Sequence, residues 1–208
     1  ADEPFGFEGG TEVVVHLAYR SQYLQHELGR VRLTLGQLSE AGLDALGIAA
    51  SDWLFVGPFP TDPAPAGYSA SFGPESDLVL DRTRNFGAGN QFWHFVQEYE
   101  DGRLNGGLPV GVNVSYVGRR VFVPSARTLA ASLGSDDGFR LFLDGVEVSR
   151  SEVPRSLAAD QNRVEGTLPA GTHTLVLEIV NTGGDAGFAW RFERGEHELT
   201  GDLLAAFL

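Results

Sequence analysis

Apolar and polar residues alternate along much of this chain, which is the pattern of β-strands with one buried face. The strands that this pattern predicts lie at 13–17, 31–35, 110–116, 119–123, 129–133, 139–143, 146–148, 163–168, 172–180 and 188–193, and the apolar run at 52–59 predicts a buried strand that opens the sandwich. A short helix is predicted at 39–46, where Ser39 can act as N-cap, and a second at 199–208. Turn signals recur between strands at spacings of roughly 8 to 12 residues. The sequence therefore predicts an all-β, jelly-roll-like antiparallel β-sandwich with a short helix or two.

Residues 129–148 show the clearest succession of strands and turns. Alternation over 129–133 stops at Ser-Asp-Asp-Gly (135–138), where Asp can cap its own backbone and Gly can adopt a positive φ. Alternation resumes at 139–143 and is followed by Asp-Gly (144–145), a strong hairpin signal. We expect a β-meander with an acidic corner.

Large apolar residues that fall on one parity of these strands, or in the apolar run at 52–59, form the predicted core. They are Trp53, Phe55, Phe139, Leu141, Leu175, Leu177 and Trp190. The aromatic run at 92–96 could be a platform for sugar rings, but core packing is favoured because large aromatics usually carry core energetics. The proline-rich stretch at 60–73 is expected to be an extended surface loop.

Charge and composition limit the classes of function. The net charge of −13 disfavours nucleic acid and anionic lipid as partners, since both select basic patches. The chain has no Cys, which excludes disulfides, thiolate metal sites and haem attachment through C-x-x-C-H. No apolar run approaches the roughly 20 residues of a membrane span. An acidic chain of this kind fits a secreted or cell-surface protein.

Two blocks, SDDGFRLFLDGVEV from Ser135 and LPAGTHTLVLEIVNTGGDAGFAWRF from Leu168, resemble the protective-antigen-type β-sandwich of bacterial toxins, glycosidases and yeast adhesins. Together with WLFVGPFP from Trp53, these blocks are also similar to carbohydrate-binding-like modules of large secreted planctomycete proteins that carry cytochrome c-like domains. The resemblance implies a β-sandwich fold and says little about chemistry.

In adhesins of that family, adjacent aspartates at the acidic turn, joined by a cis peptide bond, bind Ca²⁺, and the ion ligates sugar hydroxyls. The resemblance implies that Asp136, Asp137 and Asn181 bind the metal, and that Asp185 joins them in the ligand-binding site. Hard oxygen ligands from two loops suit Ca²⁺. The alternative is a structural turn whose carboxylates cap backbone N–H groups.

The chain divides into four predicted parts. Residues 1–36 hold two strands that resemble the end of a laminin-G or concanavalin-like domain, 37–50 form a connector, 51–195 the β-sandwich and 196–208 a tail or short helix. Because an isolated pair of strands is only marginally stable, residues 11–35 are expected to pair with this sandwich, a preceding domain or another protein chain.

Catalytic signatures are missing from the sequence. There is no G-x-S-x-G elbow, and no H-x-H or H-E-x-x-H spacing that would place two histidines on one metal. We therefore predict a non-catalytic carbohydrate-binding-like module with a glycan partner. The alternative is a structural subunit that assembles through residues 11–35, because unpaired strands are templates for pairing.

Overall fold

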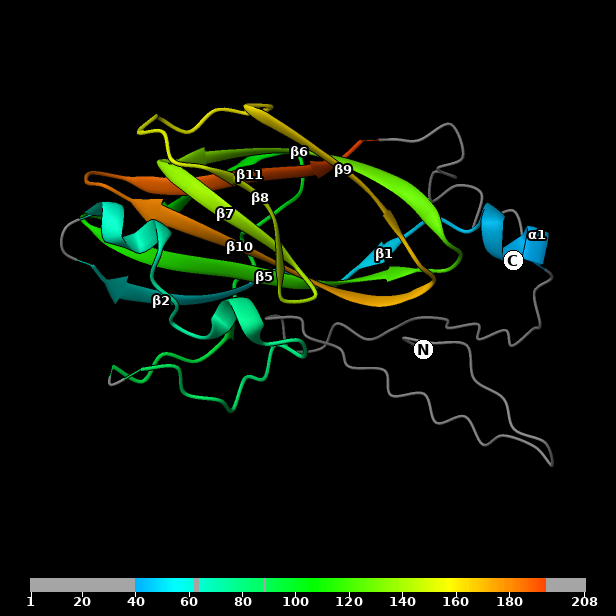
Figure 1. Cartoon of the computed structure of the whole chain (residues 1–208), viewed down its shortest axis with the longest axis horizontal. Coiled ribbons are helices and arrows are strands. Elements are labelled where there is room, and N and C mark those ends of the chain that lie inside the picture. The colour runs from blue at the N-terminus through cyan, green and yellow to red at the C-terminus, as the bar shows by residue number, and fades with distance from the viewer. Residues whose placement is uncertain (1–39, 62–63, 88, 194–208) are drawn as a thin grey trace, which may run out of the picture.

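The computed structural model describes residues 40–61, 64–87 and 89–193, which form two antiparallel sheets packed face to face (Figure 1). The predicted antiparallel β-sandwich is confirmed. The helical elements are α1 (Glu40–Ala45), at the predicted place, and two short 3-10 turns, η1 (Ala64–Tyr68) and η2 (Pro74–Ser76). The strands predicted at 13–17 and 31–35 and the helix predicted at 199–208 lie outside the described residues. No helix in the described part is long and apolar enough to cross a membrane.

Sheet A has seven strands in the order β3-β2-β5-β10-β7-β8, with β1 also paired to β5. Their bounds are β1 (Ala49–Ala50), β2 (Leu54–Pro60), β3 (His94–Phe95), β5 (Asn113–Val123), β7 (Gly138–Leu143), β8 (Val146–Ser151) and β10 (Gly171–Asn181). Sheet B has four strands in the order β4-β11-β6-β9. These are β4 (Leu104–Leu108), β6 (Arg127–Asp136), β9 (Asn162–Leu168) and β11 (Ala186–Phe192).

The space between the two sheets is filled by the inner core, a cluster of apolar side chains beside which Arg119 lies, its Cζ 4.6 Å from the centre of the Trp53 ring. Its largest members come from sheet A and sheet B alike, and they include Trp53, Phe55, Phe139, Leu141, Leu175, Leu177, Phe188 and Trp190. All seven predicted core residues belong to this cluster, so the predicted faces of their strands are confirmed.

A second cluster, the outer core, lies on the other face of sheet A. Tyr68, Leu80 and Trp93 pack there against residues of the sheet, which are Val56, Phe59, Val114, Tyr116, Phe142, Val176 and Val180. The prediction of an exposed proline-rich loop is therefore wrong in part: η1 and the residues that follow it cover the sheet and bury Tyr68. Trp93 is only 1% exposed, which confirms the core interpretation for this residue of the aromatic run, whereas His94 is exposed.

The predicted meander is also corrected at one place. β6 pairs with β9 and β11 in sheet B, whereas β7 pairs with β8 and β10 in sheet A. Only Asp137 separates the two strands, too few residues for a hairpin loop, and the chain passes from one sheet to the other. The second turn is a true hairpin: Asp144 and Gly145 have φ values of 49° and 77°, as a two-residue loop requires.

Candidate functional site

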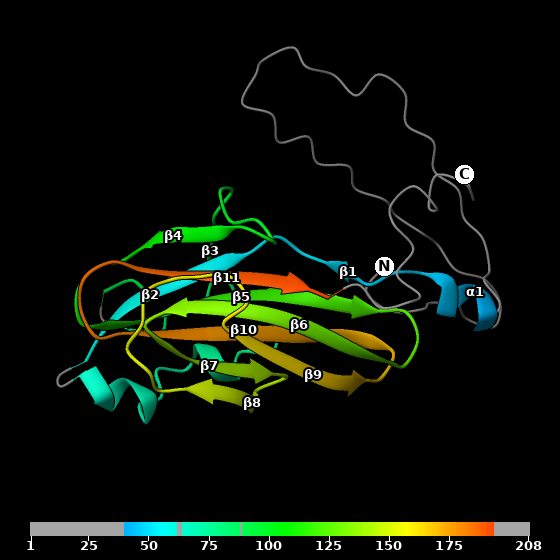
Figure 2. The same cartoon turned by 90° about the horizontal axis from the view of Figure 1, so that it is seen from above.

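The acidic corner, residues Ser135 to Gly138, lies at the end of the sandwich opposite α1, beside the loop between β10 and β11 (Figures 1 and 2). The peptide bond between Asp136 and Asp137 is cis. Gly138 is needed for a reason other than the predicted positive φ. A Cβ at this position would lie 2.0 Å from Tyr68 Oη and 2.5 Å from the Ser151 carbonyl oxygen, so no side chain fits.

Asp137 joins three parts of the chain at this corner. Its Oδ1 accepts a hydrogen bond from the Arg155 backbone N–H at 2.9 Å, and its Oδ2 accepts one from the Thr182 N–H at 2.8 Å. Its carbonyl oxygen accepts a bond from Ser135 Oγ at 2.7 Å. The carboxylate is buried, and it therefore holds the β8–β9 loop and the β10–β11 loop against the corner.

Asp136 is less buried and less engaged than its neighbour. Its Oδ2 accepts one long hydrogen bond, 3.3 Å, from the Leu157 N–H, and no donor among the described residues is assigned to Oδ1. Desolvation raises the pKa of Asp136, and the negative charges of Asp137 and Asp185 raise it further against the effect of the Leu157 N–H. Asp185 itself is exposed on the β10–β11 loop.

Asn181 shapes that loop from within, and it is 1% exposed. Its Oδ1 accepts a hydrogen bond from the Gly183 N–H at 3.0 Å, and its Nδ2 donates to the Gly184 carbonyl oxygen at 3.2 Å. A third loop, residues 109–112, is attached here because the Gly111 N–H donates to the same Gly184 oxygen at 2.9 Å.

The predicted site residues thus gather at one end of the fold. Asp136, Asp137 and Asp185 are close enough to influence one another electrostatically, and Asn181 sits at the base of the loop that carries Asp185. Within the described ranges no three His, Cys, Asp or Glu side chains are arranged to hold a metal. Chemically, the corner offers oxygen acceptors and concentrated negative charge.

Sequence reasoning missed the partners of the two aspartates. Arg155 and Leu157 bind them through backbone N–H groups, which no residue type reveals. The Arg155 guanidinium donates to Ser135 Oγ at 2.8 Å, and its Cζ lies 5.8 Å from the centre of the Phe139 ring. Thr182 is a third partner, since its N–H donates to Asp137. The only sign of this role in the sequence was its position next to Asn181 in a Gly-rich turn.

A second polar cluster, also missed, lies in the outer core. Glu178 of β10 is 0% exposed, and its Oε2 is 3.3 Å from Arg140 Nη1. Desolvation raises the pKa of Glu178 to about 7, in spite of the nearby Arg140 charge, and Glu75 adds to the rise. Burial and the charges of both glutamates raise the pKa of Tyr116. A glutamate in the middle of the apolar run of β10 was the visible sign of this cluster.

Comparisons with known proteins concern the fold. No family model matches the chain, and no curated protein matches it. The chain is similar in structure to the PA14 sugar-binding domain from an RTX adhesin, with 17% identity, a TM-score of 0.39, and coverage of 72% of this chain and 94% of that one.

Two further solved structures are similar at the same level. The epithelial adhesin 9 A domain from Candida glabrata, in complex with Galβ1-4GlcNAc, shares 12% identity at a TM-score of 0.40, covering 73% of this chain and 85% of that one. The PA14 domain of the antifreeze protein MpAFP shares 17% identity at a TM-score of 0.34, covering 41% of this chain. The match spans 46% of the MpAFP chain. At these identities the likeness concerns the fold alone.

Proposed function

We propose that the chain is a non-catalytic carbohydrate-binding-like module of a secreted or cell-surface protein, and that it binds glycans through Ca²⁺ at the acidic corner. One observation carries the proposal: Asp136 and Asp137 are adjacent at one end of the sandwich, and the Asp137 carboxylate holds against them the loop that carries Asp185. Asp136 Oδ1 has no assigned donor in the described part of the chain, and the Arg155 guanidinium points to Ser135. Uncompensated carboxylates favour a hard cation.

The remaining ligands would be neutral oxygens. Asn181 and the backbone carbonyls of residues 182 and 183 lie in the loop that Asp137 holds against the corner. Asp137 Oδ2 accepts from both the N–H and the hydroxyl of Thr182, whereas Oδ1 accepts, among the described residues, only from the Arg155 N–H and keeps a second acceptor site for an ion. The loops are already held by these hydrogen bonds, and we therefore expect the ion to bind a preformed corner with little rearrangement of the fold.

The surroundings of the corner suit a sugar. A Ca²⁺ ion takes 6 to 8 oxygen ligands, and an ion held at an exposed corner can complete its shell with ligand hydroxyls. Beside it, the 109–112 loop presents Val110, 71% exposed, and Val112, 44% exposed. These apolar side chains can contact the carbon face of a pyranose ring while its hydroxyls meet the ion.

Thermal melting of EDTA-treated protein tests the metal. At about a hundredfold excess of Ca²⁺ over Kd the fold should gain about 2.7 kcal/mol, which corresponds to a rise in Tm of roughly 5 to 10 °C for a domain of this size. Asp136→Asn should abolish the rise and leave the fold intact, since Asp136 makes one long hydrogen bond. Asp137→Asn is a poorer probe, because its amide would face an N–H donor.

Glu98→Gln is the matched control, since it removes one exposed carboxylate elsewhere and should leave the Ca²⁺ response unchanged. A melting temperature that ignores millimolar Ca²⁺ would contradict the metal site. A glycan array read with Ca²⁺ and with EDTA tests the ligand: binding should occur only with Ca²⁺ and be lost in Asp136→Asn. A Ca²⁺ response without any glycan signal would sink the carbohydrate proposal alone.

A further inference from the structure

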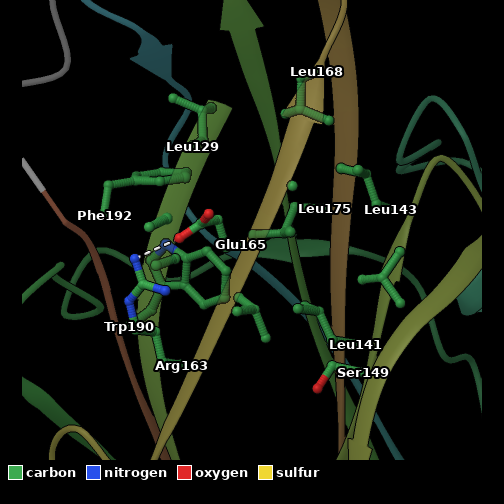
Figure 3. Close-up of a pocket in the computed structure, with 15 residues that line it drawn as sticks. Leu129, Leu141, Leu143, Ser149, Arg163, Glu165, Leu168, Leu175, Trp190 and Phe192 are labelled. Carbon is green, nitrogen blue, oxygen red and sulfur yellow. Dashed lines mark ion pairs between the residues drawn. The ribbon is translucent and has the colours of Figure 1, made fainter. Parts of the chain in front are cut away.

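An apolar cleft of about 330 Å³ opens along one long side of the sandwich, between the inner faces of the two sheets (Figure 3). We call it the edge cleft. Leu129, Trp190 and Phe192 of sheet B face Leu141, Leu143 and Leu175 of sheet A across it. Its volume equals about eleven waters at ~30 Å³ each, which is room for a few aliphatic side chains.

Both strands that border the edge cleft end their sheets. β8 pairs only with β7, and β9 pairs only with β6, within the described part of the chain. Each therefore presents a row of backbone N–H and C=O groups without a strand partner, which is a template for adding a strand. A gap in the lining lies on β9, where a Cβ placed on Gly166 would meet no atom within 4 Å.

The chain enters the described structure at the end of this cleft. Arg127, whose partner across the β6–β9 pair is Leu168, donates from its guanidinium to the carbonyl oxygens of Leu46, at 2.5 Å, and Asp44, at 3.4 Å. Asp44 is in α1, and Leu46 is the residue that follows this helix. These bonds therefore hold α1 beside the end of β9, and Figures 1 and 2 show both at the same end of the sandwich.

The segment just before α1 has the pattern that the cleft requires. Val31, Leu33 and Leu35 alternate with Arg32 and Thr34. Four residues, 36–39, separate this segment from Glu40, and when extended they span about 13 Å. β9 is seven residues long, or about 23 Å. The segment can therefore turn back from α1 and lie along β9.

We propose that residues 31–35 of this same chain add to the free edge of β9 as a further strand of sheet B, and that Val31, Leu33 and Leu35 fill the edge cleft. The outward residues, Arg32 and Thr34, then continue the polar surface on which Arg163 and Glu165 form an ion pair of 2.6 Å. The short tether gives the segment an effective concentration on the order of millimolar, which favours it over the same segment of a second copy.

The proposal has a consequence for assembly. A chain that fills its own edge cleft has no free strand in residues 31–35 to donate to a neighbour. The edge cleft and the acidic corner lie at different places in the fold, so closure leaves glycan binding untouched, and the two proposals stand or fall separately.

Cysteine cross-linking of the full chain tests this placement, and the chain contains no Cys to interfere. Gly166→Cys is combined in turn with a cysteine at each position from 31 to 35, since Gly166 has space for a side chain and neighbouring strands bring Cβ atoms within disulfide range. Oxidation should give an intramolecular disulfide, seen as a faster band on non-reducing gels, at least tenfold more at positions 31, 33 or 35 than at 32 and 34.

Three results would overturn the proposal. Disulfide-linked dimers in place of the fast monomer band would assign the cleft to a second copy. Equal yields at all five positions would show that the segment has no fixed face. No cross-link at any position would leave the cleft to another occupant.

A pair of charge substitutions provides a second test of this placement, and it requires no disulfide. Leu33→Asp should lower Tm and increase the fluorescence of a hydrophobic dye, because the cleft loses its cover. Thr34→Asp introduces the same charge on the outward face of the proposed strand, and it should change neither Tm nor dye fluorescence. Equal effects from both variants would contradict the predicted orientation of the strand.

Discussion

Sheet A separates two cores that are built in different ways. The inner core takes apolar side chains from both sheets, and the Arg119–Asp101 ion pair and His173 lie beside it. The outer core joins apolar residues of sheet A to a covering segment, and it lies beside buried Glu75 and Glu178. The first follows from strand periodicity, since each strand contributes its alternate positions. The second depends on where an irregular segment folds, which periodicity does not encode.

The two cores also differ in how their stability depends on solution conditions. Burial of apolar surface contributes a free energy that does not change with pH. The outer core holds ionisable groups: Arg140 contacts Glu178 at 3.3 Å and Glu147 at 2.8 Å, and its guanidinium lies 4.9 Å from the centre of the Phe142 ring. Charges in a buried site cost desolvation free energy, so this side of sheet A should respond to pH.

The largest expected effect comes from opening a cavity in the inner core. Leu141→Ala removes a side chain that is 1% exposed, and it should lower the free energy of unfolding by about 2 to 5 kcal/mol. Urea denaturation measures the loss. Val146→Ala, on the same hairpin but 65% exposed, should cost less than about 0.5 kcal/mol. If the two variants unfold alike, the assignment of faces in β7 and β8 is wrong.

The outer core should reveal itself through pH. The pKa of Glu178 is raised from 4.5 to about 7, so the folded state binds a proton that the unfolded state has released. Stability should therefore fall as the pH rises from about 4.5 to about 7, by up to roughly 3 kcal/mol. Glu178→Gln mimics the protonated side chain and should remove this fall, as urea denaturation at several pH values would show.

Glu98→Gln, which changes an exposed glutamate, serves as the reference and should keep the pH profile of the parent. A Glu178→Gln variant whose stability falls with pH as steeply as that of the parent would refute the role given to Glu178. The pH response of sheet A would then have to come from another group.

A smaller effect of pH on stability is expected on the inner side of β10, the strand that carries Glu178 on its outer side. His173 of β10 lies between two acceptors: Nδ1 is 2.7 Å from Asp144 Oδ2, and Nε2 is 3.0 Å from the Pro169 carbonyl oxygen. Burial alone would lower the pKa of His173, but the bonds to Asp144 and Pro169 outweigh it and raise the pKa above 6.5. When the imidazole is protonated, both ring nitrogens donate to these acceptors.

The stability that His173 supplies should be fully present below about pH 6.5 and be lost as the pH rises through the folded-state pKa. His173→Gln should cost about 1 to 2 kcal/mol at pH 5.5 and distinctly less at pH 8.5. A cost that is the same at both values would mean that the imidazole is neutral throughout.

Sequence reasoning succeeded where a local pattern determines the structure. The parity of Leu141 and Leu175 located the inner core, and Asp144–Gly145 located the hairpin. It failed at the proline-rich segment, because composition indicates that a stretch is irregular without indicating what it covers. The meander was mistaken for a similar reason: alternation identifies β6 and β7 as strands but carries no information on which sheet each one joins.

At the acidic corner the sequence identified residues but not their contacts. Resemblance pointed to Asp136, Asp137 and the β10–β11 loop, and the structure brings these together. No role was predicted for the β8–β9 loop. Its contribution is made by backbone N–H groups, which every non-proline residue carries, and side-chain identity therefore could not reveal it.

That backbone contribution limits how this region can change over evolution. Asp137 and Asp136 bind the N–H groups of Arg155 and Leu157, two positions apart on the β8–β9 loop. Because the contacts do not depend on which side chain stands at Leu157, substitution there is compatible with the corner, except by proline. An inserted or deleted residue before this pair would shift both donors out of register with the aspartates. The loop can thus vary in side chain at Leu157, whereas the number of residues before this pair is fixed.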